Sequence, residues 1–514
     1  MSGFEKNVHL KPTHYHDNVT IARTKHGNKG LEAQTPTGDL TYKYKVLPGT
    51  MNWDGYVNMY KTDGVTIPGG SCYSVGTGGH ISGGGYGLLS RLQGLTSDWL
   101  TAVDVVLPPT ADRSEPALVH AKRPDSDGSG GVNEDLFQLC CGAGGGNVGV
   151  ITAFYFDELP KAPSDAVLLF VTIPWNQFES STDGKRKFNV LIRSFVEYFE
   201  KIDQDHTQRD LFSILHVPHH SKDITMTVQC VNIDLDNNDR LEFAKRVNSS
   251  INALFSALSL SKKLTDDTVE YKLSDTTAHF RHSDSLPMPQ KSNHPVQEHL
   301  KGDALEGAVA MNWLEAVQYA NGSGHNRRGK YKSAYLKSVP AQFSDGLHEA
   351  LTSKPNELIS ANEEKQLNVS DCIVAFDSYG GAINGKSSSH DSVFQRSSYA
   401  KIQYQAYWHD YELDEKYVSW LNRVYMKCFP TQIDGFPWDS NDDHYQGCYI
   451  NYPDIEMLEF ERPSSPYTGT PHQWLELYFG PEIGHDLMQA KQKYDPLDVF
   501  HHAMSIPLPE SMTR

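Results

Sequence analysis

The sequence predicts an α+β protein that is built from two domains, a glycine-rich domain followed by a larger one. Its 514 residues exceed the usual length of a single domain. The first third holds two glycine-rich segments, residues 69–87 and 140–149, and each precedes an apolar strand. After residue 156, apolar strands alternate with stretches that repeat at helical spacing. We therefore expect the second domain to be a sheet that is covered by helices and that floors a pocket.

The densest glycine segment, residues 69–87, contains nine glycines among its nineteen residues and one cysteine, Cys72. A glycine inside a helix or strand costs roughly 0.5–1 kcal/mol relative to alanine, so this segment is poorly suited to regular structure. Glycines let the backbone approach a ligand, and consecutive free N–H groups form a concavity that binds anions. The segment therefore predicts a site for a phosphate-bearing cofactor, and the alternative is a tight glycine-rich turn without a ligand.

The second glycine segment repeats this arrangement. Residues 140–156 (CCGAGGGNVGVITAFYF) run from glycines into an apolar strand, and residues 88–107 read as a short helix, a turn and a buried strand. Two glycine-rich crossings that lead into two strands indicate one extended ligand across both. A dinucleotide has the required length.

The remaining chain is patterned as follows. Residues 1–47 are polar and weakly patterned, and residues 41–68 suggest a strand, a turn and a short amphipathic helix. Strands are expected at residues 166–175, 223–233, 371–377, 402–408 and 474–479, and helices at residues 188–202, 242–260 and 419–429.

Composition excludes several classes of protein. A net charge of −18 makes nucleic acid or an anionic membrane a poor partner, whereas neutral substrates stay open. Seven scattered cysteines lack the spacing of a disulfide scaffold or a zinc finger, and residues 216–220 (HVPHH) lack a carboxylate that would support a metal site. No metal is therefore expected. No secretory signal or membrane-spanning run is visible, so the location is unknown and the cytoplasm is the default.

Several separated motifs resemble those of one family, the berberine-bridge-enzyme-like FAD oxidases of the vanillyl-alcohol-oxidase fold. Residues 68–87 resemble the cysteine-bearing loop, residues 142–152 (GAGGGNVGVIT) the second flavin-contacting segment, and residues 447–457 (GCYINYPDIEM) the tyrosine-containing active-site strand. Residues 321–335 and 376–384 are similar to the hexose oxidase and carbohydrate oxidase branch. The resemblance extends from about residue 48 to residue 507.

The resemblance implies a PCMH-type FAD-binding domain at residues 48–160, a substrate domain with an antiparallel sheet and helices at 161–484, and a return to the FAD domain at 485–514. Residues 1–47 would be a diverged or truncated N-terminal segment. The family's Arg-Ser-Gly-Gly-His segment, whose histidine bonds flavin, has no counterpart before Cys72. We expect that this first flavin lobe is either missing or replaced by a reduced version, and that FAD binding is weakened.

Cys72 is the predicted covalent anchor of the cofactor. A thiolate is the reactive form of cysteine, and the backbone N–H dipoles around Cys72 are expected to lower its pKa. In the family the matching cysteine attacks flavin C6. The alternative is a small buried thiol without a chemical role.

Tyr452 is the predicted catalytic base. Oxidation of a sugar at C1 requires a hydroxyl proton to leave while a hydride moves to the flavin, so the pKa of this tyrosine should be lowered from about 10. Asp377 would orient Tyr452 or relay its proton, Tyr379 would contact sugar or flavin, and Asn451 would bond the isoalloxazine. The alternatives are a strand tyrosine for Tyr452 and a turn-capping aspartate for Asp377.

The other predicted cofactor contacts come from the two glycine segments. They are Gly76, Gly78, Gly79, His80, Gly83, Gly84, Gly85, Gly145, Gly146, Asn147 and Gly149. The basic run that includes Arg327, Arg328, Lys330 and Lys332 is interpreted first as a solvated loop. Its resemblance to the hexose oxidase branch also hints at a place by the substrate entrance or the flavin.

These features predict an FAD-dependent oxidase of mono- or oligosaccharides. It would oxidise the anomeric carbon to a lactone and pass electrons to molecular oxygen, giving hydrogen peroxide, with FAD covalently held by Cys72. One alternative is a flavin oxidase that tailors a glycosylated polyketide or an alkaloid. An alternative of another class is a non-catalytic remnant that binds no flavin.

Overall fold

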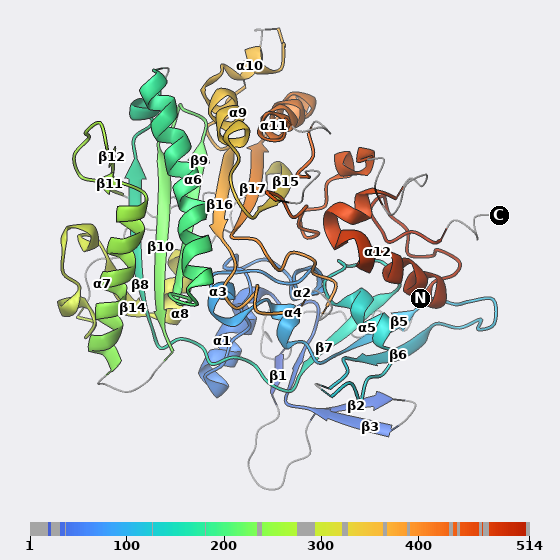
Figure 1. Ribbon diagram of the computed structural model, residues 1–514. Coiled ribbons are helices and arrows are strands. Elements are labelled where there is room, and N and C mark those ends of the chain that lie inside the picture. Colours follow the sequence, from blue (N-terminus) through green and yellow to red (C-terminus); the bar gives the residue numbers. More distant parts are fainter. Residues whose placement is uncertain are drawn as a thin grey trace.

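The computed structural model describes residues 19–21, 31–35 and 38–509. Within the last range, residues 126, 180, 234–238, 275–292, 321–326, 363–366, 388–390, 431–434, 439–442, 462–464 and 466–471 are not described. Two antiparallel sheets and their helices form an α+β fold, which confirms the expected class (Figure 1). None of the helices within the described residues is both long and apolar enough to cross a membrane.

The smaller sheet has five strands in the order β1 (Val19–Ile21), β4 (Tyr44–Val46), β7 (Val150–Phe156), β5 (Ala102–Leu107) and β6 (Ala117–Lys122). The short helices that belong to it are α1 (Asn52–Asp63), α2 (Thr77–Ser82), α3 (Ser90–Gln93), α4 (Thr96–Trp99) and α5 (Glu134–Cys140). A hairpin of β2 (Leu31–Thr35) and β3 (Gly38–Tyr42) lies at its side. The expected strand and helix in residues 41–68 and the expected helix, turn and strand in residues 88–107 are confirmed.

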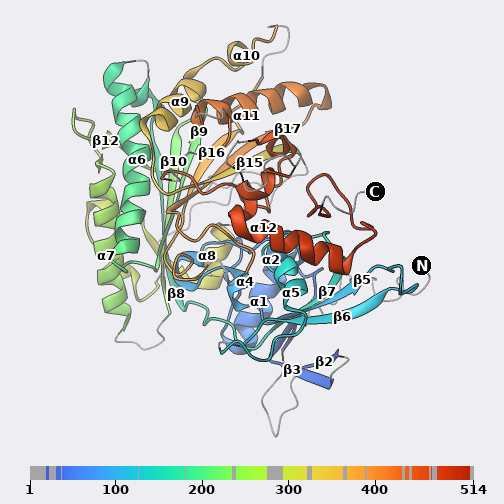
Figure 2. The same cartoon turned by 45° about the vertical axis from the view of Figure 1, so that its right-hand side comes forward.

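The larger sheet has eight strands. Seven follow the order β13 (Lys272–Leu273), β8 (Asp165–Ile173), β10 (Ile224–Asn232), β9 (Leu211–Pro218), β16 (Ile373–Ser378), β17 (Ala400–Trp408) and β15 (Arg328–Leu336), and β14 (Val309–Asn312) also pairs with β8. One face is covered by α6 (Thr182–Gln204), α7 (Asp239–Ala257), α9 (Ala341–Thr352) and α11 (Asp414–Cys428) (Figures 1 and 2). The other face turns toward the smaller sheet and its helices (Figure 2).

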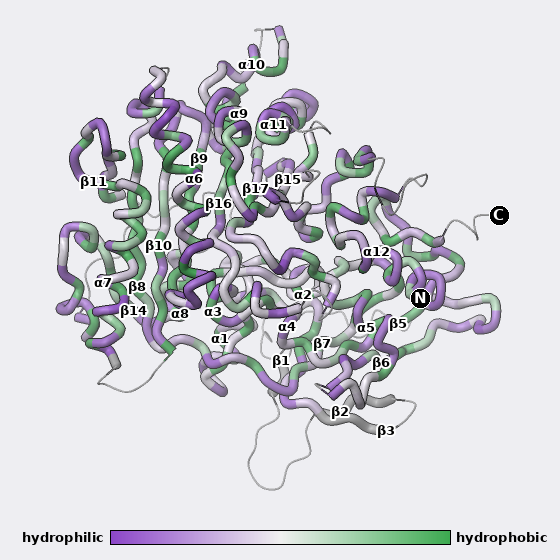
Figure 3. The backbone as a smooth tube through the Cα atoms, in the orientation of Figure 1, coloured by the Kyte–Doolittle hydropathy of each residue, from purple (hydrophilic) through white to green (hydrophobic). Residues whose placement is uncertain are grey.

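The elements of the larger sheet follow from its residue pattern. β8 and β10 are both buried over almost their whole length. β8 (DAVLLFVTI) is a nearly continuous apolar run, whereas β10 (ITMTVQCVN) alternates apolar residues with threonine and glutamine over most of its length (Figure 3). Shorter elements complete the domain: α8 (Trp313–Tyr319), α10 (Pro355–Leu358) and the parallel pair of β11 (Leu260–Ser261) and β12 (Val269–Glu270).

The predicted strand at residues 474–479 is wrong. These residues form the first turns of α12 (Trp474–Tyr494), which breaks at Gly480 with φ 73° and resumes at Pro481. All six residues of the segment are buried. A helix that is buried on every side shows no polar face, so periodicity cannot distinguish it from a buried strand.

Candidate active site

The loop that carries Cys72 is held in shape by three side chains that converge on Gly70. Asn52 and Tyr56 of α1 donate hydrogen bonds to the Gly70 carbonyl at 3.0 and 2.7 Å, and the Gly70 N–H donates to His80 Nε2 at 2.9 Å. Burial, together with the nearby Lys401 cation, lowers the pKa of His80 to about 4. His80 is therefore neutral at physiological pH and acts as an acceptor that shapes this loop.

The two glycine segments contact each other directly. The N–H groups of Gly142 and Gly144 donate to the Ser82 carbonyl at 2.7 and 2.9 Å. Asn451 donates from Nδ2 to the His80 carbonyl at 3.0 Å and to the Tyr449 hydroxyl at 2.9 Å. The Tyr452 turn, the Cys72 loop and the second glycine segment therefore lie against one another.

The predicted cradle glycines fall into two groups. A Cβ on Gly79 would meet nothing within 4 Å, and one on Gly145 would meet only the Ser82 hydroxyl, at 3.4 Å. Other glycines are required by close protein neighbours, namely Gly78 by Pro48, Gly83 by Asn451, Gly85 by Thr96 and Gly149 by Val106. Gly76 is the N-cap of α2, and Gly84 and Gly146 have φ of 107° and 78°. Open backbone at two joined glycine segments, beside a partly exposed cysteine, fits a flavin cofactor.

The side chain of Asn147 is hydrogen-bonded to backbone groups of the protein. Its Nδ2 donates to the carbonyls of Ala143 and Gly144, both at 3.1 Å, and its Oδ1 accepts from the Ile506 N–H at 3.0 Å. The side chain therefore joins the second glycine segment to the C-terminal segment. Its predicted cofactor contact stays a prediction that these bonds do not favour.

One face of the larger sheet carries polar side chains toward Tyr452. Because side chains alternate along a strand, Lys401, Gln403, Gln405 and Tyr407 of β17 share a face. The register pairs Asp377 of β16 with Lys401, and Tyr331 of β15 with Gln405. The sheet thus presents a row of polar groups to the turn that carries Tyr452. The expected active-site strand at residues 447–457 is wrong, because these residues form a loop, a turn and the start of a 3-10 helix (Ile455–Glu459).

Tyr452 lies over this row. Its hydroxyl donates to Gln403 Oε1 at 2.7 Å, and its ring stacks on Tyr331 with centroids 5.8 Å apart and an interplanar angle of 11°. Lys401 Nζ lies 5.3 Å from the centroid of the Tyr452 ring. Burial, followed by the Asp377 carboxylate, raises the pKa of Tyr452 well above its ordinary value. This corrects the expected lowering of that pKa, since desolvation disfavours the phenolate.

Asp377 is linked to Tyr452 through a third residue. Its carboxylate pairs with Lys401 Nζ at 3.0 Å and accepts a hydrogen bond from Gln403 Nε2, whose amide oxygen accepts from Tyr452. Burial raises the pKa of Asp377, and Lys401 offsets only part of this. The structure therefore joins the two predicted residues by way of Gln403 and gives Asp377 an increased affinity for a proton.

Cys72 lies within electrostatic range of the same groups. The largest causes that raise the pKa of Tyr452 are, in decreasing order, burial, Asp377, Tyr449 and the charge of Cys72. The charge of Cys72 also favours the protonated form of Lys401. The candidate anchor and the candidate base therefore face one region. Their chemical roles stay predictions.

Tyr379 is completely buried, and its hydroxyl donates to the Gln395 carbonyl at 3.0 Å. Its ring packs 5.4 Å from that of Tyr86 and 5.0 Å from that of Tyr335. This placement favours a packing role, and contact with sugar or flavin stays a prediction.

The basic run is not simply a solvated loop. Lys332 is 2% exposed and pairs with Asp454, and Lys330 pairs with Asp454 at 2.6 Å and with Glu456. These lysines lie on the face of β15 opposite to that of Tyr331. Through Asp454 and Glu456 they fix the segment that follows Tyr452. Arg327 and Arg328 pair with Asp371 and Asp414, and residues 321–326 lie outside the described residues.

Sequence reasoning missed Lys401, Gln403, Gln405 and Tyr407. The signal was present as the alternation KIQYQAYW at residues 401–408, in which every second residue is polar or tyrosine. Alternation identifies a shared face, but only the sheet register shows that this face meets Asp377 and Tyr452.

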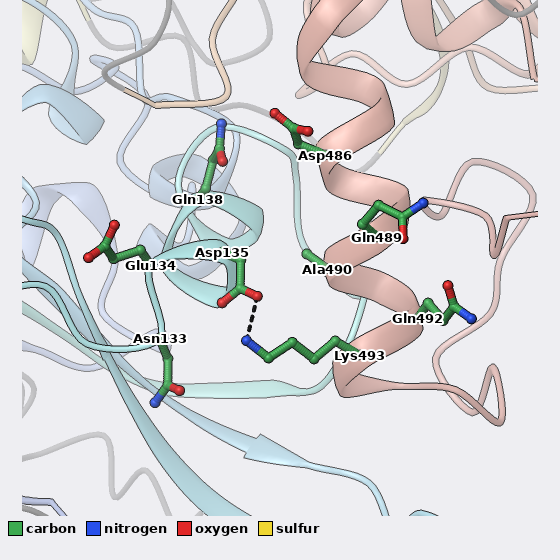
Figure 4. Close-up of a pocket in the computed structure, with 9 residues that line it drawn as sticks. All are labelled: Asn133, Glu134, Asp135, Gln138, Asp486, Gln489, Ala490, Gln492 and Lys493. Atoms are coloured by element: carbon green, nitrogen blue, oxygen red, sulfur yellow. Dashed lines mark hydrogen bonds and ion pairs between the residues drawn. The ribbon is translucent and has the colours of Figure 1, made fainter.

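A surface cleft of about 880 Å³ lies elsewhere, between α5 and α12 (Figure 4). Its lining residues are polar, and the Lys493 ammonium reaches across it to Asp135 at 2.6 Å. Within the described ranges, no group of three or more His, Cys, Asp or Glu side chains is placed to hold a metal ion.

The fold and the joined glycine segments define an FAD-linked oxidoreductase, and comparison with known proteins identifies its family. Residues 448–507 match the family "Berberine and berberine like". Hexose oxidase of Chondrus crispus is 30% identical over 479 residues, which cover 90% of this chain and 78% of that protein. Aclacinomycin-N/aclacinomycin-A oxidase of Streptomyces galilaeus is 28% identical, over 91% of this chain and 73% of that protein.

Solved structures with similar folds belong to oxidoreductases as well. Aclacinomycin oxidoreductase superposes with a TM-score of 0.69 and 26% identity, covering 91% of this chain and 81% of that one. A glycopeptide hexose oxidase in complex with teicoplanin shares the fold, with a TM-score of 0.67, 24% identity and coverage of 93% and 82%. The chain belongs to the berberine-bridge-enzyme-like FAD-linked oxidases, which confirms the resemblance that its motifs indicated.

Proposed function

We propose that this protein oxidises the anomeric carbon of a mono- or oligosaccharide to a lactone, with oxygen as the electron acceptor. The observation that carries this proposal is the Tyr452 hydroxyl, which lies over a polar strand face and within electrostatic range of Cys72. The 30% identity to hexose oxidase supports a sugar as substrate.

The protein's own residues supply proton transfer and orientation. Bound FAD would supply the hydride acceptor for C1 and the route of the electrons to oxygen, with hydrogen peroxide as the product. Tyr452 receives the proton of the anomeric hydroxyl, and Asp377 takes up the proton that Tyr452 must first lose. Lys401 forms an ion pair with Asp377 at 3.0 Å, and its cation stabilises negative charge on Asp377 or on Tyr452. Cys72, Gly79 and Gly145 would hold the cofactor, with Asn451 beside it.

The tether to Cys72 is tested by acid precipitation of the purified protein. We expect the wild-type pellet to keep its yellow colour, whereas Cys72→Ala should release its flavin into the supernatant, because only the thiolate forms the bond. Ser74→Ala, an exposed change two residues along the same loop, should behave as wild type. Release of flavin from the wild-type protein would contradict the covalent link.

The substrate class is tested by anaerobic loss of the visible flavin absorbance on addition of a sugar. Glucose, galactose, lactose and cellobiose each have a free anomeric hydroxyl, whereas methyl glucoside does not. We expect reduction by at least one free sugar and none by methyl glucoside, because oxidation at C1 requires that hydroxyl. A protein that takes up no added FAD would support a non-catalytic role instead.

A second candidate function is the tailoring of a glycosylated natural product. The 28% identity to an aclacinomycin oxidase favours it. Reduction by a glycosylated polyketide, with no reaction toward the free sugars, would select this alternative.

A further inference from the structure

We propose that Gln403, Gln405 and Tyr407 form a hydrogen-bonded chain whose direction reverses when Tyr452 gives up its proton to Asp377. Gln403 is then a positioning residue that couples the protonation states of the other two. This inference rests on the proposed role of Tyr452 as the base.

The chain runs along one face of β17. The Tyr407 hydroxyl donates to Gln405 Oε1 at 3.0 Å, and Gln405 Nε2 donates to Gln403 Oε1 at 2.7 Å. Gln403 Nε2 donates to the Asp377 carboxylate, and the Tyr452 hydroxyl donates to Gln403 Oε1 at 2.7 Å. Every donor in the strand therefore points toward Asp377.

This direction determines the state of Tyr452. An ionised carboxylate only accepts hydrogen bonds, so Gln403 must turn its NH₂ group toward Asp377 and its oxygen toward Tyr452. Tyr452 is consequently the donor in its contact with Gln403, and a phenol that donates there is neutral. A neutral phenol cannot take a proton from a sugar, so the observed arrangement is the resting one.

The active arrangement follows from turning the Gln403 amide by half a turn. Its NH₂ group then donates to the Tyr452 phenolate, and its oxygen faces Asp377, which must carry a proton to donate in return. Gln405 turns with it, and the Tyr407 hydroxyl changes from donor to acceptor. Tyr452 loses one proton and Asp377 gains one, so the net charge is unchanged. We assign the transfer of the proton between them to a water molecule from solvent.

Lys401 suits both arrangements. Its Nζ lies 3.0 Å from Asp377 and 5.3 Å from the Tyr452 ring centroid, so a cation stays beside the negative charge wherever that charge resides. The other titratable groups around Tyr452 are Tyr331 on β15, Tyr407 on β17, Tyr449 in its own turn, Tyr86, and Cys72 in the cysteine loop. Among the surrounding groups that these contacts define, Asp377 is the carboxylate, and it shares Gln403 as a hydrogen-bond partner with Tyr452.

The decisive experiment is the pH dependence of anaerobic flavin reduction in Asp377→Asn. Simple electrostatics predicts that the ascending limb of the profile of reduction rate against pH moves to lower pH. Removing the carboxylate leaves the Lys401 cation unopposed beside the phenol, which favours the phenolate. The proposal predicts the opposite. Without its internal acceptor, Tyr452 must lose its proton to solvent, so the limb should move up by at least about one pH unit, a tenfold loss of rate on that limb.

Two further variants complete the test. Gln403→Met keeps the ion pair of Lys401 and Asp377 but removes the amide that would bond the phenolate, and it should shift the limb upward as well. Asp377→Glu keeps a carboxylate and should restore the limb to near its wild-type position. Ultraviolet titration of tyrosinate, as the difference between each holoenzyme and its Tyr452→Phe form, should show the same order of pKa values, because the flavin absorbance is common to both proteins and cancels.

The outcomes separate the two proposals. A downward or unchanged limb in both Asp377→Asn and Gln403→Met, with Tyr452→Phe inactive, would overturn the reversing chain and leave the base assignment intact. Full activity of Tyr452→Phe would instead overturn the proposed function itself.

Discussion

Replacing Tyr452 by phenylalanine is expected to slow anaerobic flavin reduction by sugar by about 10²–10⁴-fold, the usual contribution of a positioned general base. The substitution removes one oxygen atom, the one that donates to Gln403 at 2.7 Å, and keeps the ring that stacks on Tyr331. Stopped-flow measurement of reduction in the absence of oxygen isolates this step. The sugar concentration that gives half-maximal rate should change much less than the rate itself.

Thermal unfolding provides the control for this prediction. Tyr452→Phe should unfold close to the wild-type temperature, since the ring contacts persist, and Tyr411→Phe, at a 70% exposed tyrosine, should match the wild type in rate and stability. A reduction rate within a few-fold of wild type in Tyr452→Phe would remove the residue from the chemistry.

Replacing Lys491 by methionine is expected to cost about 3–5 kcal/mol of unfolding free energy, because it leaves a buried charge without its partner. Lys491 is fully buried in α12, and its Nζ lies 2.8 Å from Asp495 and 2.9 Å from Asp498. It also donates to the carbonyls of Asn147 and Phe500, both at 2.8 Å. The same change should therefore loosen the second glycine segment and weaken FAD binding.

Urea unfolding of the holoenzyme measures the first effect. Flavin released on gel filtration, compared between Cys72→Ala and the double variant Cys72→Ala/Lys491→Met, measures the second, because the cofactor is not tethered in either protein. The matched control is Lys493→Met, two residues away in the same helix. Its side chain is 57% exposed and pairs with Asp135 at 2.6 Å, so its loss should cost at most about 1 kcal/mol. Equal destabilisation by the two variants would show that Lys491 is no anchor of the glycine segment.

The sequence by itself determined the features that depend on neighbouring residues. The clustered glycines around Cys72 and in residues 142–149 predicted where the backbone would approach a cofactor, because missing Cβ atoms are visible without a structure. Apolar runs and helical spacing predicted β8, β10, β16 and β17 and the helices α6, α7 and α11, but not β9, β15 or α9. The motif around Tyr452 was one of those that identified the family. The prediction from sequence failed at residues 474–479, because every residue of this first part of α12 is buried and the segment shows no periodic signal.

Only the tertiary structure decided how distant residues act on one another. The register of β16 and β17 sets Lys401 beside Asp377, and the turn that carries Tyr452 then meets Gln403 across 49 positions of sequence. The direction of the Tyr452 pKa shift follows from burial and a carboxylate 75 positions away (452 − 377), so no local pattern could reveal it. The predicted cradle glycines differ in their surroundings for the same reason. Whether a glycine faces open space or another segment depends on packing. Local sequence encodes conformational preference, whereas electrostatics and contact require the folded chain.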